Sequence, residues 1–324
     1  MEAGLLERAY GNYKFANINR KKETTVYYIK QQDGTGTGRM ETCDIFPGVQ
    51  ISFNSLSMDT CFQQIRADRG FWEIDYCSEG CYEMGYNDQK VAFLKEKMLS
   101  VTDLGSQVFT YSRIPFREYH GISILLELEK VQPILHGEFA GSGICFSELA
   151  EIMRLDRGPY LMRPLHKIEA IFKELENRRN CRGGDDIRYF WLKTVELLLY
   201  LSKPDQERMK SVHSFDANTG QGIREVYQYI LEHPFEHITI PELADMFRLA
   251  ESSMKRCFKY STGKSIGSFQ KERRMEAAAE LLLKKREWSV GEIAEAAGYE
   301  NQSKFSAAFK SVYRETPLAF RRCR

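Results

Sequence analysis

The stretch Thr239-Ile-Pro-Glu242-Leu243-Ala244 decides the fold of the C-terminal part of the chain, because it recurs 50 residues later as Ser289-Val-Gly-Glu292-Ile293-Ala294. Thr and Ser are favourable N-cap residues, and in each copy a Glu three positions later completes a capping box. Each copy therefore predicts the start of a helix. Residues 266–285, between the copies, read as one long helix, which would hold the two copies at a fixed distance.

A second pattern follows each copy after a short turn. It is Ser252-Ser253-Met254 with Phe258-Lys259 in the first copy, and Ser303-Lys304-Phe305 with Phe309-Lys310 in the second. The offset is now 51, so the second turn is one residue longer, near Gly298. Two copies of a helix, a tight turn and a polar-faced helix predict two linked helix-turn-helix units. Such a unit places a row of side chains in a DNA groove.

The second helix of each copy, about residues 251–261 and 302–312, is a candidate recognition helix. Short Ser side chains allow close approach to DNA, Lys and Arg can donate to guanine or phosphate, and Gln suits adenine. One such helix alone is more often an ordinary solvated helix, whereas two copies in register favour DNA binding. The expected base contacts are Ser252, Ser253, Lys255, Arg256, Gln302, Ser303 and Lys304, and the expected phosphate contacts are Lys259 and Lys310.

The charge of the chain is unevenly distributed along its 324 residues. Residues 251–324 hold 16 Lys and Arg against 9 Asp and Glu, a net charge of +7. Because the whole chain carries +1, residues 1–250 carry −6. A basic C-terminal portion on an acidic body indicates a nucleic-acid surface. A segment of this charge could also be merely soluble, so the repeat carries the argument.

The first half of the chain reads as short β-strands. From Phe71 the period is two, since Trp72, Ile74 and Tyr76 alternate with more polar residues, and the turn-rich Ser78-Glu-Gly80 predicts a hairpin. Further strands are expected at residues 91–94, 98–101, 108–112 and 121–128. Many short strands with close turns predict a small β-barrel or a double sheet.

The period then changes to about 3.6, which predicts a pair of helices before a polar, turn-rich segment. We therefore expect an α+β chain with a β-rich domain at residues 1–155, a helical pair at 156–201, a linker at 202–221 and an all-α DNA-binding domain at 222–324.

The C-terminal region resembles the AraC/XylS transcription regulators over about residues 223–322. The resemblance implies that both recognition helices enter successive major grooves on one face of DNA, and that the chain controls transcription through RNA polymerase. Two positions depart from the family pattern: Ala250 replaces a capping Ser, and Arg314 replaces a Gly. The residues that carry the resemblance are Leu243-Ala244, Met254, Arg256, Phe258-Lys259, Gly263, Phe269, Arg274-Met275, Ala278, Leu281-Leu282, Ile293-Ala294, Gly298-Tyr299, Ser303, Phe305, Phe309-Lys310, Thr316-Pro317 and Phe320-Arg321-Arg322.

The β-rich region resembles, less closely, the cupin-like sensor domains that precede such DNA-binding domains. Only His120 and His136 lie in or near this region, so no metal, no cofactor and no cupin oxygenase chemistry are expected. A small barrel can still enclose one small-molecule effector. The same aromatic residues could also be plain core. The candidate effector-binding residues are Trp72, Tyr76, Tyr82, Glu83, Phe109, Tyr111, Arg113 and His120.

The helix expected at residues 186–201 has a broader apolar face than a solvated helix needs. Two alternatives remain open: this face packs against the barrel, or it forms the seam of a homodimer, which the family resemblance favours. A homodimer would double the DNA contacts. The candidate dimerisation residues are Ile187, Phe190, Trp191, Val195 and Leu198.

The leading hypothesis is that the chain is a DNA-binding transcriptional regulator whose activity is controlled by a small-molecule effector. It is not expected to be an enzyme, although a catalytic cupin or a DNA-repair protein with an acceptor cysteine is an alternative, as is a constitutive architectural DNA binder. Eight scattered cysteines without CxxC spacing, the absence of an export signal and the absence of a long apolar run predict a cytoplasmic protein without a membrane span.

Overall fold

The chain folds into two compact units, Met1–Ala217 and Asn218–Arg324. The computed structural model describes residues 4–11, 13, 15–21, 24–30, 36–65, 70–87, 90–106, 108–137, 141–179, 184–202 and 215–323. The linker expected at residues 202–221 lies largely outside the described residues. Its last residues form a two-residue strand and the start of a helix at Ala217. None of the described helices is both long and apolar enough to cross a membrane.

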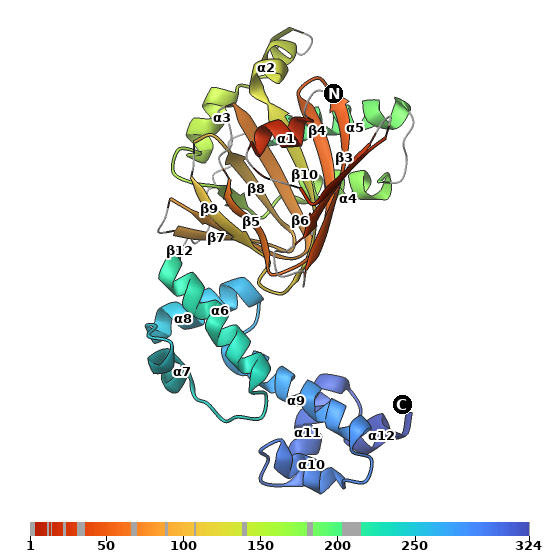
Figure 1. Cartoon of the computed structure of the whole chain (residues 1–324), viewed down its shortest axis with the longest axis vertical. Helices are drawn as coiled ribbons and strands as arrows, with labels where there is room; N and C mark the ends of the chain where they lie inside the picture. Colours follow the sequence, from red (N-terminus) through yellow and green to blue (C-terminus); the bar gives the residue numbers. More distant parts are fainter. Residues whose placement is uncertain are drawn as a thin grey trace. The chain divides into compact units, whose positions relative to one another are not determined.

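The first unit is built on antiparallel strands (Figure 1). The main path of hydrogen-bonded neighbours is β1-β2-β3-β4-β10-β6-β7-β12, and β6 also pairs with β8 and β9, which pair in turn with β11 and β5. The β-rich fold is thus confirmed, as a sheet that does not close through the described strands. The strands are β1 (Asn17–Arg20), β2 (Thr25–Lys30), β3 (Thr37–Phe46), β4 (Val49–Ser57), β5 (Thr60–Ile65), β6 (Phe71–Tyr86), β7 (Lys90–Lys95), β8 (Met98–Asp103), β9 (Phe109–Arg113), β10 (Glu118–Glu127), β11 (Tyr160–Met162) and β12 (Phe215–Asp216).

The hairpin predicted at Ser78-Glu-Gly80 is wrong, because β6 continues through these residues. The register against β10 shifts between His120 and Gly121, which leaves an extra residue in β6 and forms a bulge. Gly80 has φ 87°, and a Cβ there would lie 2.1 Å from the carbonyl oxygen of Glu118. Turn-forming residues bend this strand instead of reversing it, so β6 passes from one set of partners, β10 and β8, to another, β7 and β9.

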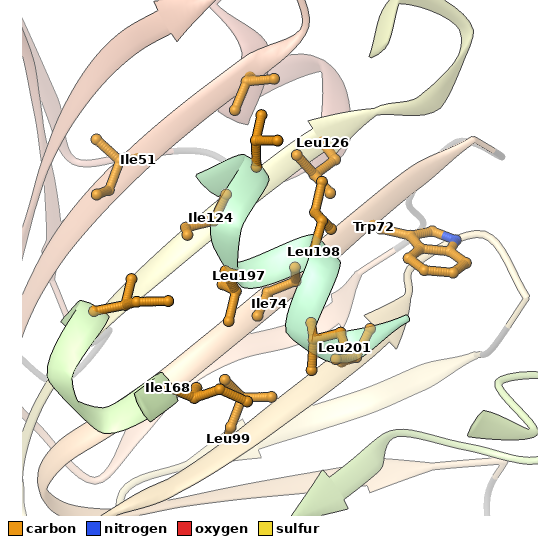
Figure 2. Close-up of a cluster of buried hydrophobic side chains, with 14 of the residues drawn as sticks. Ile51, Trp72, Ile74, Leu99, Ile124, Leu126, Ile168, Leu197, Leu198 and Leu201 are labelled. Carbon is orange, nitrogen blue, oxygen red and sulfur yellow. The ribbon is translucent and has the colours of Figure 1, made fainter. Parts of the chain in front are cut away.

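Helices cover one face of the sheet over a large apolar cluster. They are α2 (Leu128–Gly137), α3 (Phe146–Met153), α4 (His166–Asn177) and α5 (Gly184–Leu201). Figure 2 shows Leu197, Leu198 and Leu201 of α5 above Ile74 and Ile124 of the sheet. At roughly 1.5–3 kcal/mol for each buried large apolar side chain, this cluster is a main source of stability for the unit.

The structure shows that the apolar face of α5 packs within its own unit. Phe190, Val195 and Leu198 are buried in the same cluster, and the ring of Trp191 stacks on Phe46 with centroids 4.3 Å apart. Ile187 is half-buried and packs against the cluster. Of the two alternatives, packing against the sheet is therefore observed for these residues. A dimer seam built on their side chains would need a surface that they do not expose.

The second unit is helical, and one helix, α9, contacts both copies of the repeat (Figure 1). Helix α9 is unbroken, as the sequence predicts. It packs on α8 in the first copy and on α10, α11 and α12 in the second. The helices are α6 (Ala217–Glu232), α7 (Ile240–Met246), α8 (Glu251–Thr262), α9 (Ile266–Lys284), α10 (Val290–Ala296), α11 (Gln302–Tyr313) and α12 (Pro317–Cys323).

The predicted capping boxes are confirmed at the start of α7 and α10. The backbone N–H of Glu242 donates to Thr239 Oγ1, and that of Glu292 donates to Ser289 Oγ at 3.1 Å. The side chains of both glutamates accept from the backbone N–H of the capping residue, at 2.7 and 2.6 Å. These reciprocal bonds satisfy donors that a helix start leaves open, which fixes where each repeat begins.

The last residue of each candidate recognition helix, α8 and α11, is followed by a residue in the left-handed region. Gly263 has φ 75° after α8, and Arg314 has φ 63° after α11. A residue with a Cβ costs roughly 1 kcal/mol more than Gly in this conformation. Arg314 therefore carries strain that its counterpart in the first copy avoids.

Replacing Arg314 by Gly should raise the free energy of unfolding of the C-terminal unit by up to about 1 kcal/mol, because the strain of the side chain is removed. Differential scanning calorimetry of the full chain measures the change. The matched variant Gly263→Ala should lower stability by about the same amount. A lower melting temperature for Arg314→Gly would contradict the strain argument.

Candidate nucleic-acid interface and interior cavity

Helix α8 separates its apolar and polar residues cleanly. Met254, Cys257 and Phe258 are fully buried, and Phe258 meets Phe269 of α9 edge to face with centroids 5.6 Å apart. The helix starts after Ala250, which offers no side-chain hydrogen bond to the first turn, as its place in the family pattern predicts. Of the predicted DNA contacts on α8, Ser253 is half-buried and the others are exposed: Ser252, Lys255, Arg256 and Lys259.

Helix α11 also separates its apolar and polar residues, and unlike α8 it has a side-chain N-cap. Asn301 caps it by accepting a hydrogen bond from the backbone N–H of Lys304 at 2.9 Å. Phe305 and Phe309 are buried under the helix, while the predicted contacts Gln302, Ser303, Lys304 and Lys310 are all exposed. The buried rings fix the rotation of the helix, so the polar residues at its N-terminal end remain available to a partner.

The lysines of the two helices differ in their ion pairs. Lys255 pairs with Glu251 at 2.8 Å, and Lys304 pairs with Glu300 at 2.5 Å. The hydrogen bond from Lys304 holds the pKa of Glu300 below its ordinary value. Exposed pairs of this kind contribute little to stability, so a phosphate or a base could replace the carboxylate. Among the described side chains, Lys259 and Lys310 have no ion-pair partner, which suits a phosphate contact.

Two arginines of the family pattern support the backbone instead of facing outward. Arg274 of α9 donates to the carbonyl oxygens of Pro234 and Glu236, in the loop before α7, at 3.3 and 3.0 Å. Arg321 of α12 donates to the carbonyl oxygen of Trp288, in the loop before α10, at 2.8 Å. Each copy thus has one guanidinium that holds the segment leading into its first helix.

The first unit contains a partly open cavity of about 60 Å³ on the face of the sheet opposite helices α2 to α5. Short helix α1 (Leu5–Ala9) contacts β4 and β10 on this side. The strands that carry its walls are β3, β4, β6, β8, β9 and β10. The cavity is lined by Tyr10, Met40, Asn54, Leu56, Glu73, Asp75, Tyr82, Met84, Thr102, Leu104, Phe109, Tyr111, Ser112, Tyr119 and Ser123.

Two carboxyl groups lie in this cavity wall. Glu73 accepts a hydrogen bond from the hydroxyl of Tyr10 at 2.7 Å, and Asp75 accepts from Ser123 at 2.5 Å and Ser100 at 3.2 Å. Burial raises the pKa of Asp75 to about 6. Burial, together with the charge of Asp75, raises the pKa of Glu73 well above its ordinary value. The pair is therefore held partly in its neutral form by its surroundings.

Three of the eight predicted effector-binding residues line the cavity: Tyr82, Phe109 and Tyr111. Trp72 and Tyr76 do not, because they point to the helix-covered face, where Trp72 meets Phe146 and Tyr76 stacks on Phe172 with centroids 4.5 Å apart. Figure 2 shows Trp72 in that apolar cluster.

The polar candidates Glu83, Arg113 and His120 do not line the cavity. The hydroxyl of Tyr111 donates to Glu83 at 3.0 Å, and the guanidinium of Arg113 lies 5.0 Å from the centroid of the Tyr111 ring. His120 contacts the hydroxyl of Ser55 at 3.2 Å on the other face of β10. These contacts give Glu83 and Arg113 a role in positioning Tyr111.

The polar lining residues Glu73, Asp75 and Ser123 are not among the effector-binding residues predicted from the sequence. The signal was present, since Glu73 and Asp75 alternate with Trp72, Ile74 and Tyr76. That alternation indicates polar residues facing water only if one face of the sheet is exposed. Here both faces are covered, so the polar face of β6 points into an interior space.

Comparisons with known proteins agree with the C-terminal geometry. A family model for a helix-turn-helix domain matches residues 243–323. The arabinose operon regulatory protein of Salmonella typhimurium is 27% identical over 161 residues, which cover 49% of this chain and 56% of that protein. An uncharacterized HTH-type transcriptional regulator of Haemophilus influenzae is 26% identical over 159 residues, or 49% of this chain and 52% of that protein. The chain thus spans about half the length of these relatives.

Among solved structures, the chain is similar to the C-terminal domain of AraT, a response regulator from Geobacillus stearothermophilus. The two sequences are 36% identical over a match that covers 32% of this chain and 85% of the AraT domain, and the TM-score is 0.30.

Substituting Lys304→Ala or Gln302→Ala should relax base preference at defined positions of a bound DNA site, whereas Lys310→Ala should weaken binding to all sequences. Losing one phosphate contact reduces the slope of log K against log salt concentration by about 0.9. Fluorescence anisotropy with a selected duplex and a scrambled duplex measures both effects. Lys173→Ala, an exposed lysine of α4 in the first unit, is the control. Unchanged site preference in both α11 variants would place the recognition surface elsewhere.

The raised pKa of Asp75 predicts how stability depends on pH. Between the unfolded value of 3.8 and the folded value of about 6, the folded chain retains a proton that the unfolded chain has released, so stability falls as pH rises through this range. Relative to the parent, the free energy of unfolding of the Asp75→Asn variant should increase by on the order of 1–3 kcal/mol as the pH is raised from 4 to 7. Urea unfolding at several pH values tests this, with exposed Asp156→Asn as control. A constant difference across that range would refute it.

Proposed function

Because residues 243–323 form a helix-turn-helix domain of the AraC type, we propose that this chain is a sequence-specific DNA-binding transcriptional regulator. The observation that carries the proposal is the pair of helix-turn-helix units packed on a single unbroken helix, α9. Both recognition helices bury their aromatic and apolar side and expose serine, glutamine and lysine at their N-terminal turns. The net charge of +7 over residues 251–324 adds a general attraction for phosphate.

We propose further that a small molecule bound in the first unit controls this activity. A cavity walled by aromatic rings and buried hydrogen-bonding groups suits a small effector. This favours a ligand-responsive regulator over a constitutive architectural binder, which has no use for such a space. The antiparallel sheet that curves around it is compatible with a cupin-like, barrel-like sensor. Binding would act by shifting the population of states that present the DNA-binding unit.

The remaining partners follow from the same proposal. RNA polymerase would be the target of regulation, DNA the direct ligand and the cytoplasm the place of action. A homodimer would bind two such sites with a gain from effective concentration. Since the apolar side of α5 is buried, a dimer contact through this helix would use its outer side, where Leu192 is 58% exposed.

The test is selection of bound sequences from random duplex DNA by a fragment of residues 218–324, which forms a compact unit by itself. We expect enrichment of a site with two conserved elements about one helical turn, 10–10.5 base pairs, apart. The double variant Lys259→Ala with Lys310→Ala should enrich the same motif with lower yield. No enrichment at low salt would reject the proposal.

A further inference from the structure

We propose that the interior cavity of the first unit binds a small primary ammonium ion, with Glu73 and Asp75 as its counter-ions and Thr102 as a further acceptor. The inference rests on the proposed function only in taking this cavity as the effector site. The observations behind it are the unused acceptors, the charge, the aromatic walls and the size of the cavity.

Polar groups in the cavity wall have unused hydrogen-bonding capacity. Thr102 is 2% exposed, lines the cavity, and its hydroxyl has no hydrogen-bond partner. Glu73 accepts one hydrogen bond, on Oε1 from Tyr10, and no other described side chain donates to it. An ammonium group has three N–H donors and no acceptor, so it complements this set. A hydroxyl group donates only once and would leave acceptors unused.

The charge of the surroundings points the same way. None of the described residues that line the cavity is Lys, Arg or His. The titratable groups that face the two carboxyls are Tyr10 beyond α1, Cys61 on β5, Cys77 and Tyr82 on β6, and Tyr119 on β10. All of these are neutral or anionic. A buried carboxylate without a partner is strongly disfavoured, so a ligand cation would supply the missing counter-charge and an anionic ligand would be repelled.

Aromatic rings form much of the remaining wall. Tyr82 and Tyr119 lie with ring centroids 5.4 Å apart, and Tyr10, Phe109 and Tyr111 complete the set. Aromatic faces attract cations as well as apolar groups, so the rings suit both the ammonium and a short alkyl chain. A neutral alcohol could also meet the rings and carboxyls, and 1-butanol is the probe that tests this alternative.

The volume of the cavity indicates the size of the group that fits inside it. A bound water needs about 10–15 Å³ on the same measure, so about 60 Å³ holds roughly four to six non-hydrogen atoms. n-Butylamine has this size and stays charged at neutral pH, as lysine does. 1-Butanol and butyrate are matched neutral and anionic probes.

Binding of the cation would release a proton. Because burial keeps the carboxyl pair protonated in part, the step is a protein carboxylic acid plus R–NH₃⁺ going to a carboxylate–ammonium pair plus H⁺ in solvent. No bond to carbon or nitrogen changes. By linkage, affinity for the amine should increase with pH up to the pKa of the empty site, and 1-butanol should show no such dependence.

Isothermal titration calorimetry of the full chain at pH 7 tests the proposal. We expect n-butylamine to bind, with 1-butanol and butyrate at least tenfold weaker. Repeating the titration in phosphate and in Tris, whose ionisation heats differ, should show release of up to one proton. Glu73→Gln and Asp75→Asn should each weaken n-butylamine at least tenfold, while Glu118→Gln, an exposed carboxyl on β10, should not.

The outcomes separate the two proposals. Equal binding of 1-butanol and n-butylamine overturns the ammonium assignment and leaves the cavity as an effector site. Unchanged n-butylamine binding in Glu73→Gln and Asp75→Asn, or no binding of the amine, also overturns it. If a carboxyl variant does not fold, Thr102→Val provides the test. This variant should bind n-butylamine several-fold more weakly than the parent, and an unchanged affinity would overturn the ammonium assignment. DNA selection by residues 218–324 tests the regulator proposal without any ligand.

Discussion

The packing of one helix against two separate cores is the constraint on which the DNA-binding unit depends. At its start α9 places Phe269 against Tyr227, with ring centroids 4.9 Å apart, and near its end Leu282 is fully buried in the second core. These two residues are 13 positions apart, so at 1.5 Å per residue they lie about 20 Å apart along the helix axis. Because α9 is one continuous helix, the two candidate recognition helices cannot vary their spacing independently of it.

Most of the C-terminal unit could be predicted because its signals are local. A capping box involves two residues three positions apart, and the apolar face of a helix involves residues three and four positions apart. The capping box of Ser289 and Glu292 and the apolar face of α9 can therefore be predicted from the sequence. The resemblance to the AraC/XylS regulators is confirmed for this domain by the helix-turn-helix family model together with the similarity to the arabinose operon regulatory protein. The hydrogen bonds from Arg274 to the loop before α7 could not be predicted from local patterns, since the accepting carbonyl groups lie 38 and 40 residues away in the sequence.

The first unit was predicted less well, for a physical reason that β6 illustrates. Alternation along a strand shows which residues share a face, but not which face is inside. Trp72 and Tyr76 were assigned to a ligand site because they are aromatic, whereas they fill the layer between sheet and helices. Likewise, Ser78-Glu-Gly80 has the composition of a turn, and whether such residues reverse or only bend a strand depends on the partner strand, β10.

The buried carboxyl pair gives the strongest reason to regard the first unit as a binding domain and not as a scaffold. Desolvation opposes ionisation of both Glu73 and Asp75, and each would destabilise the fold less as its amide. Buried polar clusters with shifted pKa values that border a cavity are typical of functional sites. A sheet needing only a core could fill this space with apolar side chains, as its opposite face does with Ile51, Ile74 and Ile124 under α5. The polar face of β6 is therefore the feature that supports the proposed ligand site in this unit.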